Sequence, residues 1–236
     1  MTLIAIALTF GSGAADVASF TRLGNVFTSV MTGNIVLWGL ALARGSLSLA
    51  GHTAVSVGGY IAGVAGATLI AHGFRAPSRK EAGEDESPSG VLPSHVAWAL
   101  RAELILLAGF AVGWEISGAS PAGLAQFCLL AVLAAAMGMQ SAAVKDMGLS
   151  EVSTTYLTGT LTGLVSSLVS PGQDTPHGLR RFGVLIGLAA GASLSGLLIA
   201  TAADGAPALP LAALITTLVL ASGPSWRRPG AGRDSR

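Results

Sequence analysis

The sequence predicts an all-α membrane protein, a polytopic bundle of transmembrane helices. Hydrophobic residues make up 51% of the 236 residues and charged residues only 11%, against roughly a quarter charged in soluble domains. The apolar residues come in stretches of about 18 to 24, long enough to cross a bilayer core. The 32 glycines favour helices that pack closely in lipid.

Eight apolar segments follow one another along the chain, and we expect each to be helical. They are Thr2–Phe20, Val26–Ala43, His52–Phe74, Val96–Trp114, Ala122–Val144, Val152–Ser170, Phe182–Ala203 and Ala206–Ser222. Residues 75–93 form a polar stretch with prolines and serines, which predicts a solvated loop. Within one transmembrane domain (1–236), this loop divides a first half (1–114) from a second half (122–222), and a basic tail (223–236) follows.

The two halves resemble each other in three blocks, which indicates an internal repeat. The aligned blocks are residues 13–24 with 137–148, residues 28–34 with 154–160, and Gly59, Gly63 and Ala67 with Gly183, Gly187 and Gly191. In the first block Asp16 falls on Gln140. In the third block, small residues spaced by four line one helix face, which predicts close helix packing.

The number of spans decides how the halves are related. If all eight segments cross, each half has four helices and the repeats are parallel; if the first two segments of each half form one hairpin that does not fully cross, the repeats are inverted. Both arrangements occur in transporters. Either way the termini share a side, and the arginines of residues 223–236 predict that it is the cytoplasmic side of a bacterial inner membrane. With eight spans, the basic residues of 75–93 would lie on the opposite side, against this rule.

Two motifs resemble a known family. Met31-Thr32-Gly33-Asn34 in the first half and Thr154-Thr155-Tyr156-Leu157-Thr158-Gly159 in the second, with Gly138-Met139-Gln140 before it, are similar to the signature of the YoaK-like bacterial membrane proteins. The resemblance implies a multi-span inner-membrane protein, usually of about six spans, with no established substrate and no catalytic residues to transfer. The start before the first segment is shorter than the family suggests, so the natural chain is expected to begin upstream.

Asp16 is the first candidate functional residue, because an ionisable group inside a membrane segment is costly and usually functional. It could accept a proton, pair with a cation or bind backbone groups freed at a helix break. The alternative is that it caps a helix or lies at the interface near Arg22. Gln140 at the aligned position would either contact a ligand or form an interhelical hydrogen bond.

The Thr-Gly pairs are the second candidate. Glycine tolerates an unwound helix and threonine hydroxyls can satisfy the exposed backbone, so Gly33 and Gly159 are predicted as break points or as packing positions. Broken helices at matched places in two repeats indicate a transporter site. The predicted substrate-binding residues are Asp16, Thr32, Asn34, Gln140, Thr154 and Thr158; the predicted packing glycines are Gly59, Gly63, Gly183, Gly187 and Gly191.

We find no enzyme signature in the sequence: the four histidines have no metal-ligand spacing, and phosphate-loop, serine-elbow and dinucleotide motifs are missing. We therefore expect no catalysis, no metal and no cofactor. A net charge of +1 and the lack of basic stretches with aromatics predict no nucleic-acid partner. The expected partners are the lipid bilayer and an unknown small solute or ion, and a homo-oligomer is compatible with the sequence.

The functional hypothesis is a small-solute transporter or permease with a polar site between the halves. The alternative is a scaffold or accessory subunit that binds another membrane protein through its glycine-rich faces. An enzyme acting on lipid ranks third.

Overall fold

The computed structural model describes residues 1–74, 92–147, 157–169 and 175–222. These residues form an all-α bundle, as the sequence predicts. The helices in chain order are α1 (Thr2–Arg22), α2 (Met31–Ala43), α3 (Leu47–Phe74), α4 (Ser94–Ile116), α5 (Gly123–Asp146), α6 (Leu157–Val169), α7 (Thr175–Thr201), the short 3-10 helix η3 (Ala203–Gly205) and α8 (Ala208–Ser222).

Six segments are long and apolar enough to cross a membrane: α1, α3, α4, α5, α7 and the stretch from η3 to the end of α8. In contrast, α2 and α6 have 13 residues each. At 1.5 Å per residue they are about 20 Å long, short of a hydrocarbon core of about 30 Å. The protein is a multi-pass membrane protein, and the helices described within two of its eight apolar segments, α2 and α6, are too short to span. Large apolar side chains on the outer surface, such as Leu69 and Ile105, face lipid in this arrangement.

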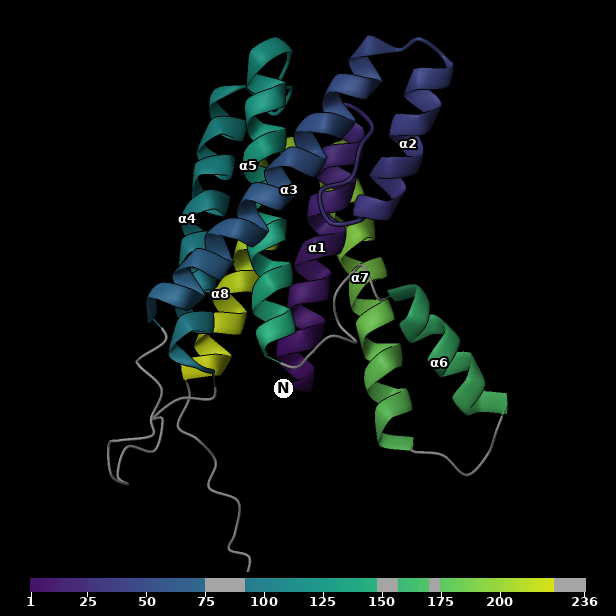
Figure 1. Ribbon diagram of the computed structural model, residues 1–236, viewed down its shortest axis with the longest axis vertical. Coiled ribbons are helices and arrows are strands. Elements are labelled where there is room, and N and C mark those ends of the chain that lie inside the picture. The colour runs from purple at the N-terminus through teal and green to yellow at the C-terminus, as the bar shows by residue number, and fades with distance from the viewer. Residues whose placement is uncertain (75–91, 148–156, 170–174, 223–236) are drawn as a thin grey trace, which may run out of the picture.

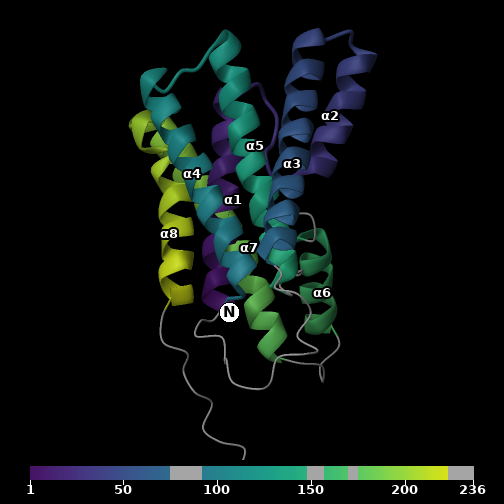
Figure 2. The ribbon, with the colours of Figure 1, turned by 60° about the vertical axis from the view of Figure 1, so that its left-hand side comes forward.

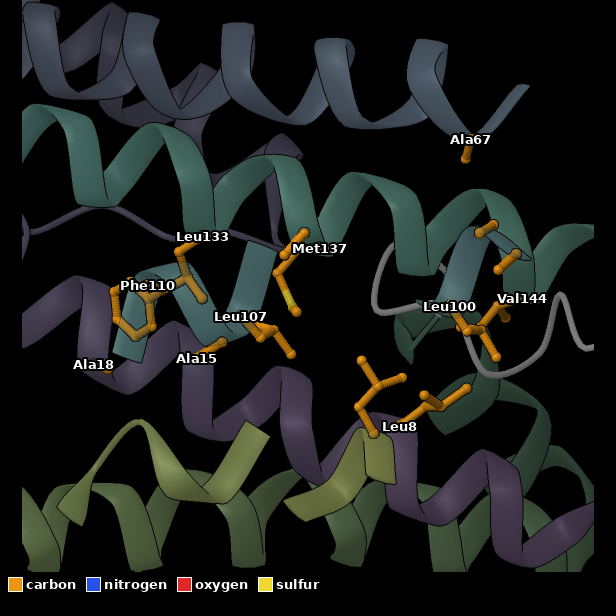
Figure 3. Close-up of a cluster of buried hydrophobic side chains, with 14 of the residues drawn as sticks. Leu8, Ala15, Ala18, Ala67, Leu100, Leu107, Phe110, Leu133, Met137 and Val144 are labelled. Carbon is orange, nitrogen blue, oxygen red and sulfur yellow. The ribbon is translucent and has the colours of Figure 1, made fainter. Parts of the chain in front are cut away.

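Helix α1 occupies the middle of the bundle (Figures 1 and 2). It is the most buried of the six spans, with 67% of its apolar window inside the structure against 22% for α3. It packs on α5, α7 and α8. Leu8 of α1, Leu107 of α4 and Met137 of α5 meet in the apolar core (Figure 3). The helix buries residues around most of its circumference, the polar Ser12 and Asp16 among them, as expected of a helix in this central place.

Close backbone contact joins α3 to α5. A Cβ atom on Gly63 would lie 2.0 Å from the carbonyl oxygen of Ala135, and one on Gly59 would lie 2.7 Å from that of Ala131. The contact four residues further along α3 is thus made with a residue four further along α5. The two helices are parallel and approach so closely because glycine has no side chain at the contact.

The same kind of contact joins α7 to α1. A Cβ atom on Gly191 would lie 2.0 Å from the carbonyl oxygen of Phe10, and one on Gly187 would lie 3.1 Å from that of Ile6. These helices are also parallel. The glycines predicted to pack, Gly59, Gly63, Gly183, Gly187 and Gly191, all lie at helix–helix contacts within the chain.

The contacts correspond in a different register from the sequence alignment. Gly63 and Gly191 make equivalent contacts, whereas the alignment pairs Gly63 with Gly187. Gly13, whose Cβ would lie 2.2 Å from a carbonyl of α7, corresponds to Gly138, whose Cβ would lie 2.2 Å from a carbonyl of α3. The alignment pairs Gly13 with Met137. The shift is one residue in the first helix and four residues, about one turn, in the third.

Helices α1 and α5 run in opposite directions. The Gln126 side chain near the start of α5 donates to the carbonyl oxygen of Arg22 at the end of α1 (2.9 Å). The Gln140 side chain near the end of α5 donates to the carbonyl oxygen of Leu8 (3.2 Å). The two tight pairs, α1 with α7 and α3 with α5, are thus oriented oppositely in the bundle.

Candidate functional site

The chain turns back into the bundle after α1. Leu23 closes the helix through a hydrogen bond from its N–H to the carbonyl oxygen of Ser19, and Gly24 and Asn25 then adopt φ values of +99° and +59°. Glycine and asparagine are the residues that accept this left-handed region most readily. Residues Leu23–Val30, here called the re-entrant segment, have no α-helical structure, and α2 begins only at Met31.

Asp16 of α1 binds the middle of the re-entrant segment. Its Oδ1 accepts hydrogen bonds from the backbone N–H groups of Thr28 and Ser29, both at 2.8 Å, and from the Thr28 hydroxyl at 3.2 Å. Its Oδ2 accepts a hydrogen bond from the Ser29 hydroxyl. Asp16 is 7% exposed. Its carboxylate therefore accepts the hydrogen bonds that the backbone N–H groups of Thr28 and Ser29 would otherwise make to water.

Asn34, in the first turn of α2, holds the neighbouring residue of the segment. The Phe27 N–H donates to Asn34 Oδ1 at 2.9 Å, and Asn34 Nδ2 donates to the Phe27 carbonyl oxygen at 2.6 Å. Nδ2 also donates to Ser56 Oγ of α3 at 3.0 Å, and the Ser56 hydroxyl donates to the same Phe27 carbonyl. Asn34 and Ser56 are fully buried.

Together these side chains satisfy both backbone groups of Phe27 and the N–H groups of the next two residues. An unpaired backbone group costs several kcal/mol in lipid, so this group of polar side chains, here called the Asp16–Asn34 cluster, makes the re-entrant segment possible. It comprises Asp16, Thr28, Ser29, Asn34 and Ser56. The carboxylate also lies next to the N-terminal end of α2, where the helix dipole favours negative charge.

The turn at Gly24 is fixed from the other side by His52 of α3. A Cβ on Gly24 would lie 2.1 Å from the His52 ring. That ring is stacked on Phe127 with 4.2 Å between centroids, and its nitrogens lie 2.7 Å from the Ser48 carbonyl and 3.1 Å from Gln126 Oε1. These contacts limit how far the His52 ring can move away from Gly24.

Gly24→Ala is expected to lower the free energy of unfolding by about 2–4 kcal/mol, the sum of a left-handed penalty and overpacking against His52. Gly45→Ala is the matched control, because Gly45 has φ +63° and nothing within 4 Å of a Cβ. It should lose only about 1–2 kcal/mol. Thermal unfolding in detergent measures both. Equal losses would show that His52 moves aside without cost.

Comparison with known proteins places the chain in a family. The model of a family described as "Protein of unknown function (DUF1275)" matches residues 4–222. The chain belongs to this family. It is also 33% identical over 167 residues to the UPF0700 transmembrane protein YoaK of Bacillus subtilis (strain 168), an alignment that covers 71% of this chain and 66% of that relative. No solved structure matches. The YoaK-like resemblance expected from the motifs is confirmed.

In this DUF1275 protein, the five predicted substrate-binding residues that lie in the described part of the chain do not form one cluster. Asp16 and Asn34 both bind the re-entrant segment. Gln140 instead donates to Ser12 Oγ at 2.8 Å, one turn before Asp16 on α1. Thr32 and Thr158 are exposed on α2 and α6. Thr154 lies outside the described residues.

The break in the first half of the DUF1275 fold also lies elsewhere than at Gly33. The irregular backbone is Leu23–Val30, and Gly33 belongs to the first turn of α2, against the Phe27 and Val30 side chains. Gly159 lies in the first turn of α6, and a Cβ there would meet nothing within 4 Å. Ser56 was not among the predicted site residues, although it lies on the small-residue face of α3, one turn before Gly59.

Proposed function

We propose that this DUF1275 protein transports a small solute across the membrane, through a polar site between two pseudo-symmetric, inverted halves. The observation that carries the proposal is the re-entrant segment with its Asp16–Asn34 cluster. Irregular backbone in lipid is tolerated where protein buries it or where it lines a cavity, and broken helices of this kind form the binding sites of many secondary transporters.

The arrangement of the helices supports two related halves. Each half contributes one short helix of 13 residues, α2 or α6, and each short helix packs on the long helix that follows it, α3 or α7. The glycine contacts of α3 with α5 recur between α7 and α1, and α1 is antiparallel to α5. An inverted repeat accounts for all of these features.

In this proposal the solute passes along the seam between α1 and α5. Ser12 and Gln140 lie on that seam, and Asp16 follows Ser12 by four residues on the same face of α1. The Asp16–Asn34 cluster shapes the first half, because its hydrogen bonds fix where the backbone of the re-entrant segment lies. The proposal includes no enzymatic step.

The scaffold alternative depends on glycine-rich faces that are free to bind a partner. Gly59, Gly63, Gly187 and Gly191 instead contact helices of the same chain at 2.0–3.1 Å from a would-be Cβ. A face already filled in this way is not available to another membrane protein. Transport is therefore the better supported of the two.

We further propose that the termini face the cytoplasm of a bacterial inner membrane. The start of α1 and the end of α8 lie at one end of the bundle (Figure 1), and Lys145, Arg180 and Arg181 lie toward the same end on α5 and α7. With six spans, the connection from α3 to α4 also belongs to this side. Its basic residues then agree with the positive-inside rule, which they would violate with eight spans.

Alternating access makes a prediction that requires no known substrate. Ser12 is 3% exposed, so in a Cys128→Ser background a cysteine at Ser12 should react with membrane-impermeant thiol reagents only when the seam opens. A transporter should allow labelling from both sides of sealed vesicles. A permanently closed seam, with no labelling in either orientation, would contradict the proposal.

A cysteine at Ser120, which is exposed in the α4–α5 turn, is the control and should label fast from one side only. Once a screen of reconstituted vesicles identifies a solute, Asp16→Asn and Asn34→Ala test the cluster directly. Unchanged flux in both variants would remove these residues from the transport site.

A further inference from the structure

Glu103 of α4 is a buried carboxyl group without a partner. The residue is 0% exposed, and neither Oε1 nor Oε2 has a hydrogen-bond partner in the described part of the chain. It lies in the middle of the helix, about 14 Å along from Ser94 at 1.5 Å per residue. The Asp16–Asn34 cluster does not include it, and it has no role in holding the re-entrant segment.

The position of Glu103 places it on the inner face of the bundle. The buried face of α4 includes Leu100, Glu103 and Leu107, spaced by three and four residues. In Figure 3, Leu107 lies beside Met137 of α5 and Leu100 lies beside Val144. Glu103 is thus level with Gln140, which lies between Met137 and Val144 in the sequence and binds Ser12 of α1.

The charged groups around Glu103 are remote along their helices. On α5, the partner packed on this face, Lys145 and Asp146 are at the helix end, where Asp146 lies 3.7 Å from His95. The α8 helix carries no ionisable side chain. The ionisable side chains of α3 are His52, Tyr60 and His72, and none of them is within hydrogen-bond distance of the Glu103 carboxyl group. Asp16 of α1 is engaged by Thr28 and Ser29. Among the residues that the structure describes, a carboxylate anion at Glu103 would therefore have no charge partner.

A groove reaches the same level from the outside. It has a volume of about 380 Å³ between α4 and α8 and is lined by Leu104, Ile215, Leu218, Val219 and Ser222. Leu104 follows Glu103 directly, and Ser222 is the last residue of α8. The groove therefore runs from the end of the bundle to the depth of the carboxyl group.

We infer that Glu103 is a proton-binding site on the inner face of α4, level with the α1–α5 seam, and that the proton is the ion coupled to transport. The neutral acid suits a site without a cation or hydrogen-bond donor, because an isolated charge at this depth is costly. A metal cation needs about six oxygen ligands, and no three His, Cys, Asp or Glu side chains come together within the described residues. The coupling role rests on the proposed transport function, while the proton site itself does not.

Infrared spectroscopy of the full-length protein in lipid vesicles tests the site without any solute. Wild type should show the C=O stretch of a buried protonated carboxylic acid, and the band should shift when the vesicles are transferred to D₂O, because a working site exchanges its proton with water. Glu103→Gln should lose the band. Glu115→Gln, at the exposed end of α4, should keep it.

Glu103→Asp is a second variant in case the glutamine protein does not fold, and it should change the frequency of the band. Absence of the band in wild type, its survival in Glu103→Gln, or a band that never exchanges in D₂O would each overturn the inference. Failure of the Ser12 labelling experiment with an exchanging Glu103 band would reject transport alone and leave the proton site in place. The two outcomes are therefore distinguishable.

Discussion

Gly63→Ala is expected to force α3 away from α5 and to lower the free energy of unfolding by about 2–3 kcal/mol, within the range for overpacking a close contact. The added Cβ would lie 2.0 Å from the carbonyl oxygen of Ala135 and 2.9 Å from its Cα. Both atoms belong to backbone, so no side-chain rotation can relieve the clash. Gly191→Ala should cause a similar loss between α7 and α1, where the Phe10 carbonyl oxygen is also 2.0 Å away.

Gly58→Ala is the matched control on the same helix, because a Cβ there would meet nothing within 4 Å. It should leave stability unchanged or raise it by up to about 1 kcal/mol, through the higher helix propensity of alanine. Unfolding of the purified protein in detergent, followed by circular dichroism, compares the three variants. If Gly58→Ala and Gly63→Ala behaved alike, the close contact of α3 with α5 would be refuted.

The glycine stripe also shows why sequence could predict this packing but not its register. Gly59, Gly63 and Ala67 repeat every four residues, and so do Gly183, Gly187 and Gly191. When one series is shifted by four residues, two of its three small residues still align with small residues of the other. The pattern therefore fits two alignments almost equally well. In the structure, the contacts that resemble each other are those of Gly63 with Ala135 and of Gly191 with Phe10.

Length and hydropathy predicted eight apolar segments, which include the six long helices, but left open whether six or eight of them span and did not reveal the re-entrant segment. Val26–Ala43 mixes apolar residues with Thr, Ser and Asn on both sides of Met31, so its composition does not separate residues 26–30 from the helix that follows. The chain reversal depends on Gly24 and Asn25, and the hydrogen bonds of Asp16 to Thr28 and Ser29 form only after that reversal. Sequence identified Asp16 and Asn34 as unusual, but not the backbone groups they bind.

Glu103 was difficult to interpret from sequence for a similar reason. It lies two residues beyond Arg101, slightly deeper in the same apolar segment, and the sequence alone leaves its partner open. On a helix, however, two residues apart means different faces, and the structure exposes Arg101 while it buries Glu103 completely. Which face is buried depends on α5 and α8, which are distant in sequence.

Asp16→Ala is expected to have the largest effect of the changes considered, a loss of about 3–5 kcal/mol in the free energy of unfolding. The substitution leaves the N–H groups of Thr28 and Ser29 and two hydroxyls without their acceptor, and hydrogen bonds to a charged group contribute about 1.5–3 kcal/mol each. Thr21→Ala is the control, since the Thr21 hydroxyl is exposed and bonds only to carbonyl oxygens of its own helix. Its effect should stay below about 0.5 kcal/mol.

Asp16→Asn separates the acceptor role of this residue from its charge. The amide keeps one oxygen for the two backbone N–H groups, so a loss of only about 1–2 kcal/mol is expected. Asn34→Ala should couple to Asp16→Ala, because both residues hold the same segment. The double variant should therefore lose less free energy of unfolding than the sum of the two single variants. Strict additivity in unfolding experiments would mean that Phe27 and Thr28–Ser29 are held independently. The re-entrant segment would then not be one structural unit.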